Sequence, residues 1–215
     1  MYKRQEPTWS NQPSRWEDLY IEGNAWHYLW FVPYNIPRLI EVQHQGNREA
    51  FLQRLNTYWQ NVYDEPDDLL PDHYYWHGNE PVIHYAWLGS LADDLESTVR
   101  ASHWILANRY KLSPEKGLDG NDDSGTLSAW YLWASMGIYP IAGTDQYALG
   151  APLFNRVEID AVQHDESSDN TSMWILDAPQ AGLNRVPRFF FKGDQPFTRP
   201  RISHQDLLLG LGVSY

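Results

Sequence analysis

The chain contains no cysteine, so its 215 residues can form neither a disulfide nor a thiolate zinc site. It also lacks any apolar run of the roughly eighteen residues that a membrane-spanning helix needs, so no span is predicted. The first ten residues lack the apolar stretch of a signal peptide. Basic residues are scarce: 16 Lys and Arg against 28 Asp and Glu give a net charge of −12. Because phosphate repels an acidic surface, nucleic acid is not expected as a partner.

Aromatic residues are abundant instead, with 11 Trp and 14 Tyr. Such rings pack in helical cores, where most aromatic side chains lie, and they also stack on the apolar faces of sugar rings. With 42% apolar residues, the chain is long enough to bury a core as one large domain. The composition therefore suggests a folded protein with a sugar site but does not establish one.

The pattern of apolar residues changes period near Pro140. Before it the spacing is helical, and after it short β-rich segments alternate with turn residues. The predicted fold class is mainly α with a C-terminal β segment, divided into a helical region at 1–140 and a strand-rich region at 141–215. Helices are expected at 47–63, 84–110 and 126–136, and strands at 147–149, 156–162, 173–176 and 188–191.

Three short clusters carry residues able to do chemistry. The first is Glu22-Gly23-Asn24-Ala25-Trp26-His27-Tyr28, where a carboxyl precedes an expected aromatic helix. A carboxyl against apolar rings favours its neutral form, as a general acid requires. The alternative is an ordinary Glu at the start of a helix.

The second cluster is Gly78-Asn79-Glu80-Pro81, followed by His84. Its amide and carboxylate oxygens are hard donors suited to Ca²⁺ or Mg²⁺. The alternative is an Asx turn that opens a helix at Pro81, and both interpretations can hold together.

The third cluster is Gly120-Asn121-Asp122-Asp123-Ser124-Gly125. One carboxylate would suffice to cap the helix that follows, yet two stand together. Adjacent buried carboxylates are costly without a shared cation or proton. The three clusters supply an acid, a cation site and a second acid pair, the inventory of glycoside hydrolysis by two carboxylates with a metal assisting.

The sequence resembles the C-terminal portion of glycoside hydrolase family 92, the calcium-dependent exo-acting α-mannosidases, over 19–215. The resemblance depends on motifs that occur in the same order. These are the three clusters with Val32-Pro33, Ser128-Ala129-Trp130-Tyr131, Gly137-Ile138-Tyr139-Pro140, Gly150-Ala151-Pro152-Leu153-Phe154 and Ser203-His204-Gln205-Asp206.

The resemblance implies a partial (α/α)6 barrel followed by strands that would join a β-sandwich in the full-length enzyme. It implies hydrolysis of terminal α-mannosides in N-glycans or mannans with inversion at the anomeric carbon. Because members are several times longer, we expect a fragment that is inactive without the N-terminal domain. Full-length members are expected to be periplasmic or secreted.

The resemblance also assigns roles to individual residues. Glu22 would be the general acid, and Asp122 or Asp123 the base that activates water. Asn79 and Glu80 would help to hold Ca²⁺. Trp26, His27 and His84, which lie in or beside these motifs, are expected to contact the substrate.

The chain departs from the family's usual residues near the expected calcium site. It has His27 where Gln is usual, Tyr34-Asn35 where His-Asp is usual, and Val82-Ile83 before His84 where Ser-His is usual. Imidazole is a poor calcium donor. Two alternatives therefore stand beside the mannosidase: a non-catalytic or degenerate carbohydrate-binding protein, and an unrelated helical-barrel hydrolase acting on another sugar.

Overall fold

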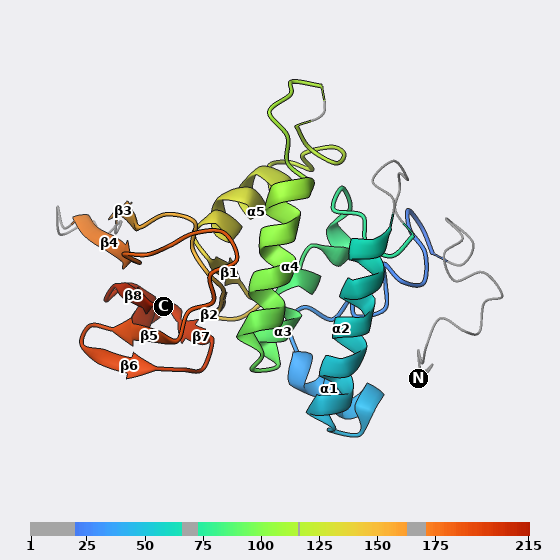
Figure 1. Ribbon diagram of the computed structural model, residues 1–215, viewed down its shortest axis with the longest axis horizontal. Coiled ribbons are helices and arrows are strands. Elements are labelled where there is room, and N and C mark those ends of the chain that lie inside the picture. The colour runs from blue at the N-terminus through green and yellow to red at the C-terminus, as the bar shows by residue number, and fades with distance from the viewer. Residues whose placement is uncertain (1–19, 66–72, 116, 163–170) are drawn as a thin grey trace.

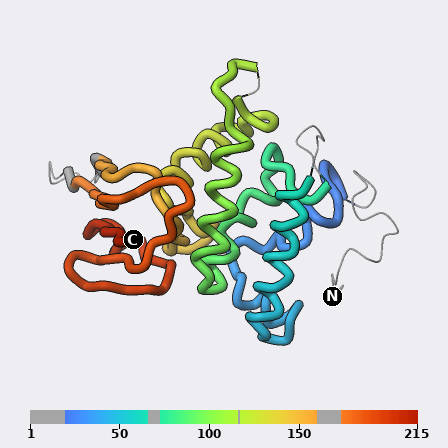
Figure 2. The backbone as a smooth tube through the Cα atoms, viewed as in Figure 1, coloured from blue at the N-terminus to red at the C-terminus, as the bar shows by residue number. Residues whose placement is uncertain are grey.

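A computed structural model describes residues 20–65, 73–115, 117–162 and 171–215 of the chain (Figure 1). Helices come first and strands last, and helix α4 lies between the helices α1 and α2 and the sheets (Figures 1 and 2). The helices are α1 (Ile36–His44), α2 (Arg48–Asp64), α3 (Leu88–Leu91), α4 (Leu95–Asn108), α5 (Thr126–Ser135) and α6 (His204–Leu207), with 3₁₀ turns η2 (Glu80–Val82) and η3 (Tyr85–Trp87). The strands are β1 (Ile138–Pro140), β2 (Gln146–Leu149), β3 (Arg156–Val162), β4 (Thr171–Asp177), β5 (Phe189–Lys192), β6 (Gln195–Phe197), β7 (Arg201–Ser203) and β8 (Leu211–Ser214).

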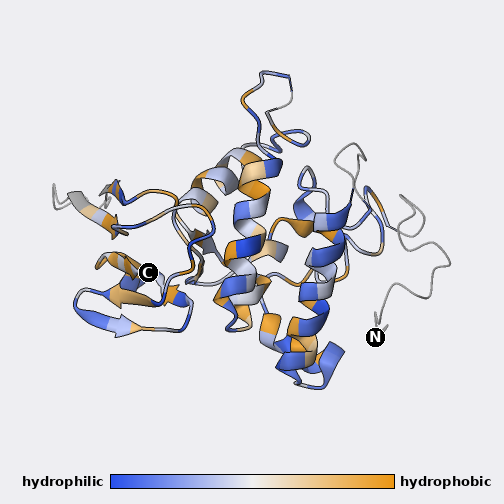
Figure 3. Ribbon diagram, in the orientation of Figure 1, coloured by the Kyte–Doolittle hydropathy of each residue, from blue (hydrophilic) through white to orange (hydrophobic). Residues whose placement is uncertain are grey.

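Two asparagine caps start the first helices. The Asn35 side chain accepts a hydrogen bond from the Arg38 amide at 3.1 Å, and Asn47 accepts one from Ala50 at 3.0 Å. Helix α2 confirms the helix expected at 47–63, whereas α1 was not predicted. Polar and apolar residues share α2, as an amphipathic helix requires (Figure 3). Its buried residues are Phe51, Leu55, Tyr58, Trp59 and Val62.

The helix expected at 84–110 is wrong as a single element, because the chain breaks between α3 and α4. The Gly89 carbonyl accepts from the amides of both Ala92 and Asp94, at 2.9 and 2.8 Å, which ends α3. Asp93 takes a left-handed φ of 62°. The Asp94 carboxylate then accepts from the Ser97 amide at 3.2 Å and starts α4. Apolar spacing runs through this break because both helices face the same core.

The helix expected at 126–136 is confirmed as α5, and all four predicted strands are present as β2 to β5. One sheet has the antiparallel order β1-β2-β7, and the other has the order β3-β4-β8-β5-β6, in which only β4 and β8 run parallel. Strands β1, β6, β7 and β8, of three or four residues each, were not predicted. Helices followed by strands confirm the coarse fold class. The barrel, the sandwich and the division after Pro140 stay predictions.

The core has a helical cluster and a sheet cluster that meet at strand β2. Ala148 is buried in the helical cluster and its neighbour Leu149 in the sheet cluster, since successive strand side chains point to opposite faces. The Ser90 hydroxyl donates to the Leu149 carbonyl at 2.6 Å, and His103 Nε2 donates to the Ala151 carbonyl at 2.8 Å. Helices α3 and α4 are therefore attached directly to the sheet.

In the described part of the chain, no helix combines the length and the apolar character needed to cross a membrane.

Candidate active site

The Glu22 segment is a series of turns, so the aromatic helix expected there is wrong. Glu22 is exposed and has a left-handed φ of 52°, so the expectation that apolar rings enclose its carboxyl is wrong. The Asn24 side-chain oxygen accepts from the amides of Trp26 and His27, at 2.9 and 3.1 Å, and holds the turn without a helix. A side chain at Gly23 would lie 2.8 Å from the Tyr28 ring, so the backbone approaches closely there.

Aromatic packing fixes the end of this segment in the helical core. The Trp30 ring packs against Tyr58 and Tyr85, with centroid distances of 5.1 and 5.3 Å. The buried Tyr85 hydroxyl accepts from the Trp30 amide at 2.8 Å and donates to the His27 carbonyl at 2.9 Å. Glu22 therefore projects from a turn whose base is rigid.

The residues predicted to contact substrate are more buried than the carboxylate of Glu22. His27 and His84 are buried, and Trp26 is half-buried against Tyr74, with a centroid distance of 5.1 Å. His84 Nε2 donates to the Trp30 carbonyl at 2.9 Å, and burial lowers the His84 pKa to about 4. His84 is thus a neutral side chain that supports the turn, and contact of these three residues with substrate stays a prediction.

The second cluster contacts the first. The Asn79 amide nitrogen donates to the Glu22 carbonyl, across 57 positions of sequence. Asn79 precedes the 3₁₀ turn η2, in which Pro81 takes an early helical position, as expected. The Asn79 side chain makes no capping hydrogen bond to this turn, so the Asx turn expected as the alternative is wrong. Glu80 is exposed, and its Oε1 accepts from the Thr126 hydroxyl at 3.2 Å.

The third cluster contacts the second through Thr126, whose hydroxyl is 2.7 Å from the Asp123 carbonyl. Asp123, Ser124 and Gly125 have consecutive left-handed φ angles of 49, 60 and 94°. The Asp122 carboxylate accepts from the amide and the hydroxyl of Ser128, at 2.9 and 2.8 Å. Asp122 therefore stabilises the first turn of α5. Asp123 is the first of the three residues with left-handed φ angles, so the backbone reverses sharply there.

The loops that carry the second and third clusters lie backbone to backbone. A side chain at Gly120 would lie 3.2 Å from the Gly78 backbone, and one at Gly78 would lie 2.8 Å from the Asp119 carbonyl. The Trp76 indole donates to that same carbonyl at 3.0 Å. Gly78 is required for this contact because a Cβ there would overlap the Trp76 ring and the Asp119 carbonyl, whereas a Cβ at Gly120 would make a tight contact.

A buried polar network beneath the loops was not predicted from the sequence. The Tyr75 hydroxyl is 2.7 Å from His77 Nδ1, and His77 Nε2 is 2.6 Å from the Tyr110 hydroxyl, which donates to the Leu127 carbonyl at 2.9 Å. These partners assign the Nε2–H tautomer to His77, whose pKa burial lowers to about 3. The network joins the chain before Gly78 to the first turn of α5.

A buried ion pair adjoins this network. Arg109 Nε lies 3.6 Å from Asp119 Oδ2, and both side chains are about nine-tenths buried or more. Burial raises the Asp119 pKa to about 6, although the charges of Arg109 and Lys111 oppose the shift. Asp119 directly precedes Gly120, so the pair fixes the base of the third cluster. In sequence, only its place before the Gly-Asn-Asp-Asp motif could have indicated this role.

Asn79 and Glu80 fit a hard cation in donor chemistry but not in number. Both offer side-chain oxygens at the loop contact, whereas Ca²⁺ takes about six to eight oxygen ligands. Within the described ranges, no group of three or more His, Asp or Glu side chains could hold a metal. Further ligands would have to be backbone carbonyls, water or substrate hydroxyls.

The family model for the glycosyl hydrolase family 92 catalytic domain matches residues 1–211. The chain belongs to glycosyl hydrolase family 92. An uncharacterized secreted glycosidase from Arthroderma benhamiae is 28% identical to this family 92 chain over 138 residues, 64% of the chain and 16% of that protein. The match to the family model confirms the family resemblance of the sequence.

Solved structures of family 92 enzymes are also similar. An inverting mannosidase from Bacteroides thetaiotaomicron is 25% identical, with a TM-score of 0.74, over 95% of this chain and 29% of that one. An α-mannosidase from the same organism, in complex with mannoimidazole, is 23% identical with a TM-score of 0.72, over 90% of this chain and 25% of that one. The family 92 chain thus spans less than a third of the length of these relatives.

Proposed function

We propose that this family 92 chain carries the catalytic residues of an α-mannosidase that removes terminal α-linked mannose with inversion. The support is of two kinds. The family includes an inverting mannosidase with the same fold, and the three predicted clusters contact one another in this chain. The substrates would be N-glycans or mannans, as the family resemblance implies.

One observation carries the proposal: direct polar contacts link the three clusters. The Glu22 carbonyl accepts from the Asn79 amide, and the Thr126 hydroxyl lies within hydrogen-bond distance of both the Glu80 carboxylate and the Asp123 carbonyl, to one of which it donates its single hydrogen. A folded core alone would not require three separate loops that carry carboxylates to contact one another beside glycines that allow close approach.

In the proposed reaction, the Glu22 carboxyl protonates the leaving oxygen while Asp122 or Asp123 accepts a proton from the attacking water. Inverting enzymes place these carboxyls about 6.5–9.5 Å apart, which leaves room for that water. Glu22 is exposed, as a group that meets a leaving group must be. Its carboxylate also contributes, after burial, to the raised pKa of Tyr28.

Asn79 and Glu80 would hold Ca²⁺ through their side-chain oxygens. When bound, the cation would grip vicinal hydroxyls of mannose and favour distortion of the ring. The chain's own contribution is to hold these two residues beside Glu22 and Thr126 through the contacts described above.

We further propose that turnover needs the N-terminal domain that longer relatives carry, and that the whole protein is periplasmic or secreted. The lengths of the solved relatives support the first statement, and the secreted glycosidase of Arthroderma benhamiae supports the second.

The test compares Glu22→Gln with Glu41→Gln, a matched change at an exposed Glu of α1 that pairs with Arg38. Each variant is assayed for release of mannose from an α-linked mannobiose, whose alcohol leaving group must be protonated, both alone and joined to the N-terminal region of a family 92 relative. We expect Glu22→Gln to lower kcat by about 10²- to 10⁴-fold with mannose binding retained, since general acid catalysis contributes that much. Equal loss in both variants, or none in either, would overturn the role of Glu22.

A second candidate is a degenerate family member that binds sugar without turnover. The burial of His27 and His84, two residues predicted to contact the substrate, favours it. It predicts mannoside binding by calorimetry in the joined protein, with no release of mannose and no effect of a chelator. Chelator-sensitive turnover excludes it, and chelator-insensitive turnover excludes the calcium role.

A further inference from the structure

Three arginines converge on the carboxylate of Asp93, in the turn between α3 and α4. Arg201 lies 3.1 Å and Arg199 3.4 Å from Asp93 Oδ1, and Arg48 lies 3.3 Å from Oδ2. The arginines come from the start of α2 and from the chain at and just before β7. Three positive charges around one negative charge leave a local excess of two, in a chain whose net charge is −12.

One carboxylate cannot satisfy three guanidinium groups. Each guanidinium offers five N–H donors, whereas a carboxylate accepts about four hydrogen bonds in total. Nε of Arg201 is buried and has no hydrogen-bond partner within the part of the chain that the structure describes. A buried charged donor without a partner is costly, so this cluster has donor capacity left for a further acceptor.

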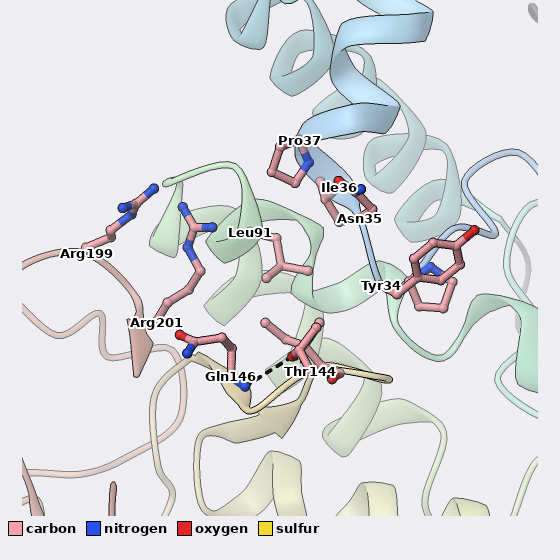
Figure 4. A pocket seen from close by; sticks show the side chains of 11 residues that line it. Tyr34, Asn35, Ile36, Pro37, Leu91, Thr144, Gln146, Arg199 and Arg201 are labelled. Atoms are coloured by element: carbon pink, nitrogen blue, oxygen red, sulfur yellow. Dashed lines mark hydrogen bonds between the residues drawn. The ribbon is translucent and has the colours of Figure 1, made fainter. Parts of the chain in front are cut away.

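A cleft of about 430 Å³ opens beside the arginines. Figure 4 shows Arg199 and Arg201 side by side at one end of the cleft, with Gln146 and Thr144 below them and Leu91 beyond. Its described lining contains two arginines and no acidic side chain. Pro33, Tyr34 and Asn35, which follow the Glu22 segment, line it, whereas the predicted catalytic and metal-binding carboxylates do not.

We propose that this cleft binds a small ligand carrying a phosphate-type oxyanion, which Arg199 and Arg201 hold through their guanidinium groups. The planar guanidinium fork matches the oxygens of such an anion and binds them in pairs. The side chains of Arg199 and Arg48 are more than half exposed, so an anion can reach them. The apolar floor and the volume leave room for an uncharged body about the size of one sugar ring.

The experiment is calorimetric titration of the 215-residue chain at low ionic strength with inorganic phosphate, glucose 6-phosphate and glucose. We expect the two phosphates to bind and glucose not to bind. Binding should weaken as salt is added, because exposed charges are screened. Glucose 6-phosphate binding more tightly than inorganic phosphate identifies a phosphorylated ligand, and equal affinities identify the free oxyanion.

Four variants make the result specific. Arg201→Gln should weaken phosphate binding by about tenfold or more, and Arg199→Gln by less, since each charge-assisted bond contributes about that much. Asp93→Asn should tighten binding severalfold by removing the competing carboxylate, and Asn tolerates the left-handed φ at this position. Arg156→Gln is the matched control and should have no effect, because Arg156 pairs with Glu158 on β3.

Absence of phosphate binding at concentrations up to about 10 mM would overturn the proposal. So would equal affinities of the wild type and Arg201→Gln, or binding of glucose as tight as that of the phosphates. The two arginine variants decide the question even if Asp93→Asn does not fold. A purely structural ion-pair cluster would lose stability in Asp93→Asn without gaining affinity.

Discussion

Asp122 and Asp123 are neighbours with different surroundings. The Asp122 carboxylate accepts two hydrogen bonds from Ser128, whereas the Asp123 backbone carbonyl, not its side chain, bonds Thr126. The cap expected from the sequence is therefore present at Asp122. A structural role and a catalytic role can fall on different members of the pair.

Asparagine substitutions separate these roles. Asp122→Asn keeps an oxygen for Ser128, and Asn is as good a helix cap as Asp, so stability should change by less than about 0.5 kcal/mol. Asp122→Asn and Asp123→Asn are then compared in the protein joined to an N-terminal domain. The variant that removes the catalytic base should lose about 10²- to 10⁴-fold in kcat, and the other variant should lose far less. Anomer-resolved NMR and urea unfolding measure the two effects. Full turnover in both variants would remove the base from this pair.

Asp119 predicts a pH dependence of stability. Its pKa is about 6 in the folded chain, above the ordinary value near 3.9. Between these values the folded state holds a proton that the unfolded state has released, so the free energy of unfolding falls as pH rises. The loss should reach about 3 kcal/mol by pH 7.

The measurement is urea unfolding of the wild type and Asp119→Asn between about pH 4 and 7. The difference between the two free energies should shift in favour of the variant as pH rises, because Asn does not titrate. A difference that stays constant over this range would contradict the assignment to Asp119.

At the scale of elements, the sequence predicted what local chemistry decides. Helix α2, helix α5 and strands β2 to β5 follow from apolar period and turn residues, which act within one segment. The break between α3 and α4 could not be seen in the apolar period. It depends on the Asp94 cap and the left-handed Asp93, whose carboxylate is held by arginines far away in sequence.

The candidate site, too, could be predicted from the sequence only in part. Its residue types could be recognised because Asn-Glu and Asp-Asp beside glycine are unusual. The contacts that join them, Asn79 to Glu22 and Thr126 to Glu80, are properties of the fold, as is the buried Arg109–Asp119 pair. No spacing in one sequence encodes them.

Gly78 gives a prediction at the scale of loops. A methyl group in Gly78→Ala would lie 2.7 Å from the Trp76 ring and 2.8 Å from the Asp119 carbonyl, so the loops must separate. We expect a loss of about 1–3 kcal/mol in unfolding free energy and a larger proportional loss of turnover. Gly182→Ala is the control, because its nearest neighbour is the Arg185 side chain at 3.5 Å. Equal behaviour of the two variants would contradict the close approach of the loops.

At the scale of the whole molecule, the helical and sheet clusters share strand β2. Gly150 lies against the Trp87 ring, where a Cβ would come within 3.0 Å of that ring, and Ser90 bonds the Leu149 carbonyl. Ile141 and Ala148 complete the helical core although they follow Pro140. The helices therefore depend on residues from the strand-rich region.

Truncation tests this dependence. A chain ending at Pro140 should lose the cooperative unfolding transition, since it lacks Ile141 and Ala148 and leaves the Ser90 hydroxyl without its acceptor. Urea unfolding followed by near-ultraviolet circular dichroism measures it against the 215-residue chain. A cooperative transition with an unchanged midpoint would show that 1–140 folds independently.

The hydrogen bonds that join the three clusters also have a kinetic consequence. They link positions 57 and 46 residues apart, so each requires closure of a long loop. Helices form within about a microsecond, whereas contacts of such separation wait for the surrounding core. During refolding, helical circular dichroism should therefore return first and the arrangement of the carboxylates last, which makes the site a late reporter of the native state.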